Sequence, residues 1–349
     1  MKKIKYIVYP VFALLLLFFV FGFIVRWPSY SIKTNGKLYV FNKKSEDITV
    51  FDLAKGREIT TIPVAIESHG AAKLLGKNKL VIANYNTKKY KHKKILIFNI
   101  DSNKVEKTIS FSEGVSGLEG IVSLPIANKV GVVSAISNEF LVINTQTETI
   151  EQRIPTKQKG SHFFVIHPKL PIAYISNRES GSVSVVNLIT NQLVKNISCG
   201  KGAIGIDCTP DGSEIWVTNR DDNSISIINT SKNEVSQTLK TGKQPISLKF
   251  SREGKYCLVA NLKDGTISVF DQKSKKVIVN RSIHGKQTAM ERALYHTPWP
   301  VNIVMHPNGL YAFISNSNAN NIQILDMHSF DFVSEIQTGE VPEAMVLIE

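Results

Sequence analysis

Short segments in which apolar and polar residues alternate run through most of the chain. Residues 224–228 read Ser-Ile-Ser-Ile-Ile, and residues 266–270 read Thr-Ile-Ser-Val-Phe. β-Branched residues in this two-residue alternation predict strands with one buried face. Turn-forming residues separate the segments, and no helical spacing of apolar residues occurs after residue 30. The pattern therefore predicts an all-β fold for the region that follows residue 30.

The strand pattern repeats with a nearly constant period. Its clearest marker is a segment ending in Asn, or once in Ser, and the seven marker residues are Asn42, Asn84, Ser134, Asn177, Asn219, Asn261 and Asn316. Successive markers are separated by 42, 50, 43, 42, 42 and 55 residues. A period of this length with four strands in each copy is typical of a β-propeller blade.

The two ends of the repeat region complement each other. Gly339-Glu-Val-Pro342 repeats Gly242-Lys-Gln-Pro245, so residues 343–349 form the first strand of an eighth copy. The first copy begins at Lys37 and lacks that strand. We therefore expect the C-terminal strand to complete the first blade, which closes a ring of seven blades without an exposed sheet edge.

These residues resemble a known family. Trp-Val-Thr-Asn at 216–219, with Pro-Asp-Gly before it at 210–212 and Thr-Gly-Lys-Gln-Pro after it at 241–245, is similar to the YVTN repeat. The resemblance covers residues 37–349 and is strongest from 160 to 285. It implies a seven-bladed propeller, commonly placed outside the cytoplasm, in a family whose functions are diverse.

Residues 1–30 differ in composition from the rest of the chain. Ile7 to Val25 is apolar throughout, with Pro10 as its only interruption. These 19 residues would form a helix about 28 Å long, enough to span a bilayer. A cleaved signal peptide is the alternative, but no small-x-small cleavage pair precedes Arg26. We therefore expect residues 1–30 to be a retained membrane anchor and residues 31–349 to be the propeller.

The charges beside this apolar segment predict its orientation. Three lysines precede it and one arginine follows it directly. An excess of basic residues before the span favours an N-terminus inside the cell. The expected location is therefore the cell membrane, with a single pass and the propeller on the extracytoplasmic side.

Composition narrows the classes of function. The formal net charge is +13, and four of these charges belong to the first 30 residues, which leaves +9 for the outer domain. This charge favours anionic polymers or envelope proteins as partners, while the expected location and the few aromatic residues among the basic ones disfavour nucleic acid. The three cysteines, Cys199, Cys208 and Cys257, are too few and irregular for a disulfide framework. Walker A, G-x-S-x-G and H-E-x-x-H motifs are absent from the sequence.

Fifteen residues before the marker, the copies differ in a way that predicts chemistry. Copies five to seven have Ile204, Ile246 and Val301 there, whereas the other four copies have the polar set Glu343, His69, Glu119 and His162. Imidazole and carboxylate groups around one mouth of the channel are a ligand set for zinc, manganese or magnesium. The alternative interpretation is a polar, solvated channel lining without a metal.

Residues 68–71, Ser-His-Gly-Ala, are similar to the Pro-His-Gly-Ile-Ala stretches of the streptogramin lyase propellers. Those enzymes use a metal and histidine at this mouth of the channel. The resemblance implies that His69 belongs to a metal-dependent site of the same kind.

Two insertions are expected on the same rim of the ring. Residues 85–94 contain a basic segment with one tyrosine in it, and its residues are Lys88, Lys89, Tyr90, Lys91, His92, Lys93 and Lys94. This segment would bind an anionic ligand or form a solvated hairpin tip. Residues 286–299 form a long connection that would serve as a lid or be a neutral insertion. In this connection Arg292 and His296 are the candidate catalytic residues, and Tyr295 and Trp299 are candidate ligand contacts.

Two hypotheses of function follow. The first, which the sequence favours, is a membrane-anchored binding or scaffold module that presents its rim to an envelope ligand or protein. The second is a metal-dependent lyase or hydrolase, of lactone or ester type, with its site at the channel mouth.

Overall fold

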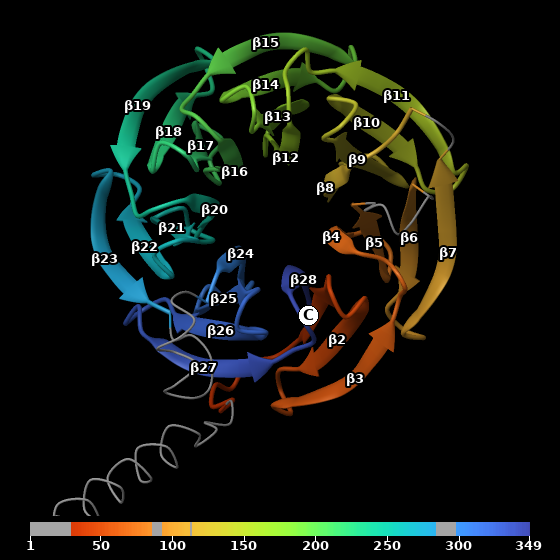
Figure 1. Cartoon of the computed structure of the whole chain (residues 1–349), viewed down its shortest axis with the longest axis vertical. Helices are drawn as coiled ribbons and strands as arrows, with labels where there is room; N and C mark the ends of the chain where they lie inside the picture. The colour runs from red at the N-terminus through yellow and green to blue at the C-terminus, as the bar shows by residue number, and fades with distance from the viewer. Residues whose placement is uncertain (1–28, 86–92, 112–113, 284–297) are drawn as a thin grey trace, which may run out of the picture.

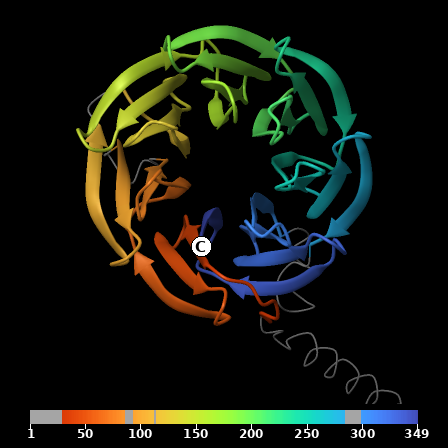
Figure 2. The same cartoon turned by 180° about the vertical axis from the view of Figure 1, so that it is seen from behind.

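The computed structural model describes residues 29–85, 93–111, 114–283 and 298–349. Within these ranges the chain forms seven antiparallel sheets of four strands each, arranged as blades around a central axis (Figure 1). The same ring is seen from behind in Figure 2. The predicted all-β, seven-bladed propeller with four-stranded blades is confirmed.

Each blade begins at the axis and proceeds outwards. In blades one to seven the innermost strands are β28 (Pro342–Ile348), β4 (Ser68–Lys73), β8 (Leu118–Ser123), β12 (Ser161–Ile166), β16 (Ala203–Cys208), β20 (Pro245–Phe250) and β24 (Pro300–Met305). The second strands are β1 (Lys37–Asn42), β5 (Lys79–Asn84), β9 (Lys129–Ser134), β13 (Ile172–Asn177), β17 (Glu214–Asn219), β21 (Tyr256–Asn261) and β25 (Tyr311–Asn316). Every marker residue ends a second strand, as the period predicts.

The two remaining positions complete each sheet. The third strands are β2 (Asp47–Asp52), β6 (Lys93–Asn99), β10 (Glu139–Asn144), β14 (Ser182–Asn187), β18 (Ser224–Asn229), β22 (Thr266–Asp271) and β26 (Asn321–Asp326). The outermost strands are β3 (Arg57–Pro63), β7 (Lys104–Phe111), β11 (Thr149–Pro155), β15 (Gln192–Ser198), β19 (Glu234–Lys240), β23 (Lys276–Ser282) and β27 (Phe332–Gln337).

The predicted seam between the chain ends is confirmed. Strand β28 pairs antiparallel with β1, with Leu38 opposite Leu347 and Val40 opposite Met345. The last strand of the chain is therefore the innermost strand of the first blade, and blade one is held by hydrogen bonds between the two ends of the propeller.

The third strands are buried on both faces, so the expectation of one buried face is wrong for them. Strand β18 is buried along nearly its whole length, because neighbouring blades pack face to face. The serines in its alternation do not face water. The Nδ2 of Asn219, itself fully buried, lies 2.9 Å from the Oγ atoms of Ser224 and Ser226, so the amide satisfies the hydroxyls that would otherwise be buried without a partner.

Aromatic side chains fill the spaces between blades. Trp216 of blade five is fully buried and packs edge-to-face against Phe250 and Phe270 of blade six, with ring centroids 5.3 and 6.0 Å away. Contacts of this kind between large side chains supply much of the hydrophobic stabilisation between neighbouring sheets.

Every innermost strand begins with a β-bulge, where the inner strand has one residue more than its neighbour. The bulge residues of blades one to seven are Glu343, His69, Glu119, His162, Ile204, Ile246 and Val301. A bulge interrupts the ladder and redirects a side chain. The position at which the sequence copies differ is therefore a point where the backbone of every blade turns a side chain out of the regular alternation.

The N-terminal side of the ring lies away from this mouth. Lys37, at the start of β1, is opposite Ile348, whereas Asn42, at its end, is opposite Pro342 beside the bulge. The preceding residues are held on the outside of the ring, where Tyr30 donates a hydrogen bond of 2.7 Å to the carbonyl of Leu53.

The predicted anchor, residues 1–30 with its helix at about 7–25, lies outside the described residues apart from Ser29 and Tyr30. In the part of the chain that the structure describes, no helix has the length and apolar character needed to cross a membrane.

Candidate functional site

Four titratable bulge residues stand on neighbouring blades at one mouth of the channel. Glycine follows two of them and lets the innermost strands come close. A Cβ on Gly70 would lie 2.5 Å from the carbonyl oxygen of Glu119, and a Cβ on Gly120 would lie 3.0 Å from that of His162. Only glycine fits such an approach without a shift of the backbone. The two glycines therefore bring the side chains of three blades within reach of one another.

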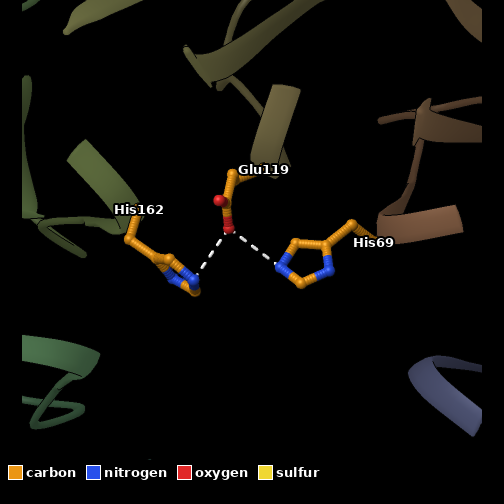
Figure 3. Close-up of side chains that lie close together, drawn as sticks. All are labelled: His69, Glu119 and His162. Carbon is orange, nitrogen blue, oxygen red and sulfur yellow. Dashed lines mark ion pairs between the residues drawn. The ribbon is translucent and has the colours of Figure 1, made fainter. Parts of the chain in front are cut away.

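His69, Glu119 and His162 converge on one point (Figure 3). The Oε2 atom of Glu119 lies 2.8 Å from Nε2 of His69 and 2.7 Å from Nε2 of His162. One ligand atom from each residue lies within 4.8 Å of the other two, and Glu119 and His162 are buried. The structure thus brings together three of the four residues expected to hold a metal.

The short contacts in this cluster lack hydrogen-bond geometry. Oε2 of Glu119 and Nε2 of His69 are both buried without a hydrogen-bond partner. Buried polar atoms are rarely left unsatisfied unless an ion or a water meets them. A tetrahedral zinc ion with ligands at about 2.1 Å would need ligand atoms about 3.4 Å apart, so a small opening of the cluster would admit it. The donor set fits a divalent metal, and its two imidazoles favour zinc.

Glu343 lies on the other side of His69. Its carboxylate contacts Nδ1 of that ring, and its Oε1 lies 3.1 Å from Nζ of Lys43. A histidine that ligates through one nitrogen is commonly oriented by a carboxylate on the other. The position of Glu343 therefore differs from the expected ligand position, because the carboxylate reaches the ring nitrogen that faces away from Glu119.

Opposing effects set the protonation of the cluster. Burial disfavours the charged form of His69, but the negative charges of Glu343 and Glu119, in close contact with its two ring nitrogens, outweigh burial and raise the pKa of His69 to about 9. Burial raises the pKa of Glu119, but its contacts with both imidazoles hold that pKa well below the ordinary value. Burial is also the main reason why the pKa of His162 is lowered. At neutral pH the cluster thus combines a cationic His69 with ionised carboxylates.

Aromatic rings enclose the cluster. The Phe163 ring is stacked nearly parallel to His69, with centroids 6.0 Å apart, and meets His162 edge-on at 4.4 Å. The ring of Tyr85 is tilted by 41° against that of His69, with centroids 5.3 Å apart. Phe163 also lines a central cavity of about 580 Å³, whose walls are formed by the innermost strands and do not include the three cluster residues.

The other predicted site residues fall into three groups. Lys88, Lys89, Tyr90, Lys91, His92, Arg292, Tyr295 and His296 lie outside the described residues. Lys93 and Lys94 belong to the start of strand β6 and not to a loop tip, because the ladder with β7 extends to the pair Lys93 and Phe111. Trp299 is half exposed, next to the start of β24.

Lys43 and Phe163 contact the site but were not expected there from the sequence. A signal for Lys43 existed, because it directly follows the marker Asn42 and the same position holds Tyr85 in blade two. Phe163 had no comparable signal, since an aromatic residue in a strand is usually core.

Comparison with solved structures shows the same fold in proteins of different sequence. The hydrazine synthase of Kuenenia stuttgartiensis superposes with a TM-score of 0.67 and 15% identity, covering 79% of this chain and 88% of that one. A functionally unknown protein from Desulfotomaculum acetoxidans superposes with a TM-score of 0.70 and 15% identity, covering 90% of this chain and 99% of that one. At this identity the likeness shows the fold alone.

Comparison of sequences gives the family. No curated protein matches the chain. The model of the YNCE-like beta-propeller family matches residues 169–346, which is more than half of the chain and includes β28 up to Val346. The chain therefore belongs to the YNCE-like beta-propeller family.

Proposed function

We propose that this protein is a metal-dependent hydrolase or lyase, acting on lactone or ester bonds, with its centre at the channel mouth. The observation that carries the proposal is the convergence of His69, Glu119 and His162 through atoms that approach closely without satisfying one another as hydrogen bonds. Two imidazoles and one carboxylate form a catalytic zinc ligand set that leaves a coordination position open.

The chain's own residues would orient and enclose this centre. His69, Glu119 and His162 would be the ligands, and a bound ion would supply Lewis acidity towards a carbonyl oxygen. Glu343 would hold His69 in the tautomer that presents Nε2, since its carboxylate meets Nδ1. Phe163 would shield the two histidine rings from water, since its ring packs against both of them.

The same proposal places the protein at a cell membrane. Residues 7–25 would be the anchor, on the strength of their apolar sequence. The chain enters the ring at Lys37, at the end of β1 that is remote from Glu343. A propeller held in this way would present its centre away from the bilayer, towards an extracytoplasmic substrate. An intact mass that includes residues 1–30 would support a retained anchor, and a mass without them would contradict it.

The test of the metal centre is elemental analysis of the full-length protein in detergent. We expect about one equivalent of a divalent metal, lost in a His69→Ala, His162→Ala double variant. His328→Ala is the matched control, because His328 is exposed on the loop between β26 and β27. Hydrolysis or elimination of a panel of lactones and esters should follow the metal content.

The experiment also decides between the two hypotheses from the sequence. A parent protein without stoichiometric metal would contradict the proposed enzyme and favour the binding or scaffold module. Neutralising Lys88 to Lys94 should then weaken crosslinking to an envelope protein or anionic polymer, since those residues were expected to form the anion-binding surface.

A further inference from the structure

The residue that directly follows a marker lies close to the bulge residue of the same blade. In blade one Lys43 contacts Glu343 with Nζ 3.1 Å from Oε1. In blade two the Tyr85 ring lies 5.3 Å from the ring of His69. In blades one and two this position therefore lies at the channel mouth, beside the cluster of His69, Glu119 and His162.

In blades four and five the position holds two arginines, Arg178 and Arg220. Arg178 directly follows Asn177, which pairs with Ser161, the residue before His162. Arg220 has the apolar Ile204 as the bulge residue of its blade. Whereas Lys43 has Glu343 as a partner, Arg220 has no carboxylate at the corresponding place.

The guanidinium of Arg220 is incompletely satisfied. Its Nε atom is buried and has no hydrogen-bond partner among the described residues. A buried N–H of a charged group without a partner is costly and is normally met by an acceptor. No carboxylate among the described residues therefore holds Arg220 through its Nε, and the residue lines a pocket that it shares with Arg178.

A pocket of about 540 Å³ joins the two arginines. It lies between blades four and five, and its walls are formed by residues 178–181, 199–202 and 220–221. Lys201 adds a third cation, while Glu179 and Asp221 contribute two carboxylates. The backbone N–H of Lys201 is already bonded to Asp222, at 2.6 Å, so this residue offers its side chain to a ligand.

We propose that this pocket binds a phosphate group of the substrate, with Arg178 and Arg220 as the recognising residues. Two guanidinium forks match the three free oxygens of a phosphate ester, whereas a carboxylate has oxygens for only one of them. Because Arg178 follows the residue that pairs with Ser161, next to His162, the pocket would hold the phosphate on the same side of the ring as the cluster of His69, Glu119 and His162. The link to catalysis rests on the proposed function, but phosphate binding itself does not.

The test is equilibrium dialysis of the full-length protein with radiolabelled inorganic phosphate, in the presence of a chelator that removes divalent metals. An Arg178→Gln, Arg220→Gln double variant should bind phosphate at least about tenfold more weakly. Arg220→Lys keeps the positive charge but not the paired N–H donors of the guanidinium, so this variant should lose part of the affinity for phosphate. Arg57→Gln is the matched control, since Arg57 is exposed on the outermost strand β3. Acetate should compete poorly.

The possible outcomes separate this inference from the proposed function. Binding that is lost in the double arginine variant and kept in Glu119→Gln supports the pocket, even if no metal is found. Binding that appears only when the chelator is left out, is lost in Glu119→Gln and survives the double arginine variant would assign the anion to the metal and overturn the inference. Equal binding in all variants, including Arg57→Gln, or no binding in a parent of native thermal stability, would also overturn it. Effective competition by acetate would replace phosphate by a carboxylate as the ligand.

Discussion

The carboxylate of Glu343 contacts Nδ1 of His69, a residue 274 positions earlier in the chain. Closure of the ring and organisation of the site are therefore one structural feature, because the strand that completes blade one also delivers the carboxylate that orients a ligand.

Glu343→Gln should weaken metal binding without opening the ring. We expect a loss of about 10-fold to 100-fold in affinity, the usual effect of removing an orienting carboxylate from a ligating histidine. Competition with a metal-binding dye measures it. Glu340→Gln is the control, because Glu340 pairs with Lys44 on the exposed surface at 3.0 Å. Equal affinities for both variants would contradict the orienting role.

The metal-free protein should lose stability in alkaline solution. The pKa of His69 is raised from 6.5 to about 9, so its protonation stabilises the fold fully below pH 6.5, and this contribution disappears as the pH rises through 9. The loss should be on the order of 3 kcal/mol at most. Chemical unfolding in a chelator between pH 6 and 10 measures it. The slope should vanish in His69→Asn and persist in His328→Asn; a parent without the slope would contradict the expectation.

Glycine follows the bulge residue in blade two, as Gly70, and in blade five, as Gly205, and this pair offers a test that separates folding from the site. Gly70→Ala would place a Cβ 2.5 Å from the carbonyl oxygen of Glu119, and Gly205→Ala would place one 2.6 Å from that of Ile246. Both changes should cost about 1–3 kcal/mol of unfolding free energy. Metal content should fall only in Gly70→Ala, because blade five carries no ligand. A parallel loss in both variants would mean that glycine serves the blades alone.

The packing between blades predicts a large effect at one tryptophan. Trp216→Ala should destabilise the protein by about 3–5 kcal/mol, since the side chain is fully buried against Phe250 and Phe270. Trp299→Ala should change stability by less than about 0.5 kcal/mol, because Trp299 is half exposed. Thermal and denaturant unfolding of the two variants would show the difference, and similar losses would contradict the packing account.

Much of the fold could be predicted from the sequence, because each blade repeats the same residues at nearly constant intervals along the chain. The spacing of the marker residues predicted the position of the second strand in each blade. The repeated turn at Gly339 to Pro342 predicted the seam between the two chain ends. The alternation in β18 predicted that its serines face solvent, and this is wrong. The sequence of one strand does not show that Asn219 forms hydrogen bonds with these serines in the core.

The position of the site was also predictable, but its internal arrangement was not. Equivalent positions in successive copies must lie side by side around the axis, so His69, Glu119 and His162 could be expected to meet. Which nitrogen of His69 faces Glu343 depends on side-chain rotation, which spacing does not record. The same holds for Arg220, because the lack of a described hydrogen-bond partner for its Nε depends on how the neighbouring blades pack.

The central claim is tested most directly by anomalous diffraction from crystals of the metal-loaded protein, recorded at the absorption edge of the ion found by elemental analysis. The account predicts one peak about 2.1 Å from Nε2 of His69, Oε2 of Glu119 and Nε2 of His162, with Glu343 still on Nδ1 of His69. A map without a peak at this point, with the three side chains joined by ordinary hydrogen bonds, would contradict it.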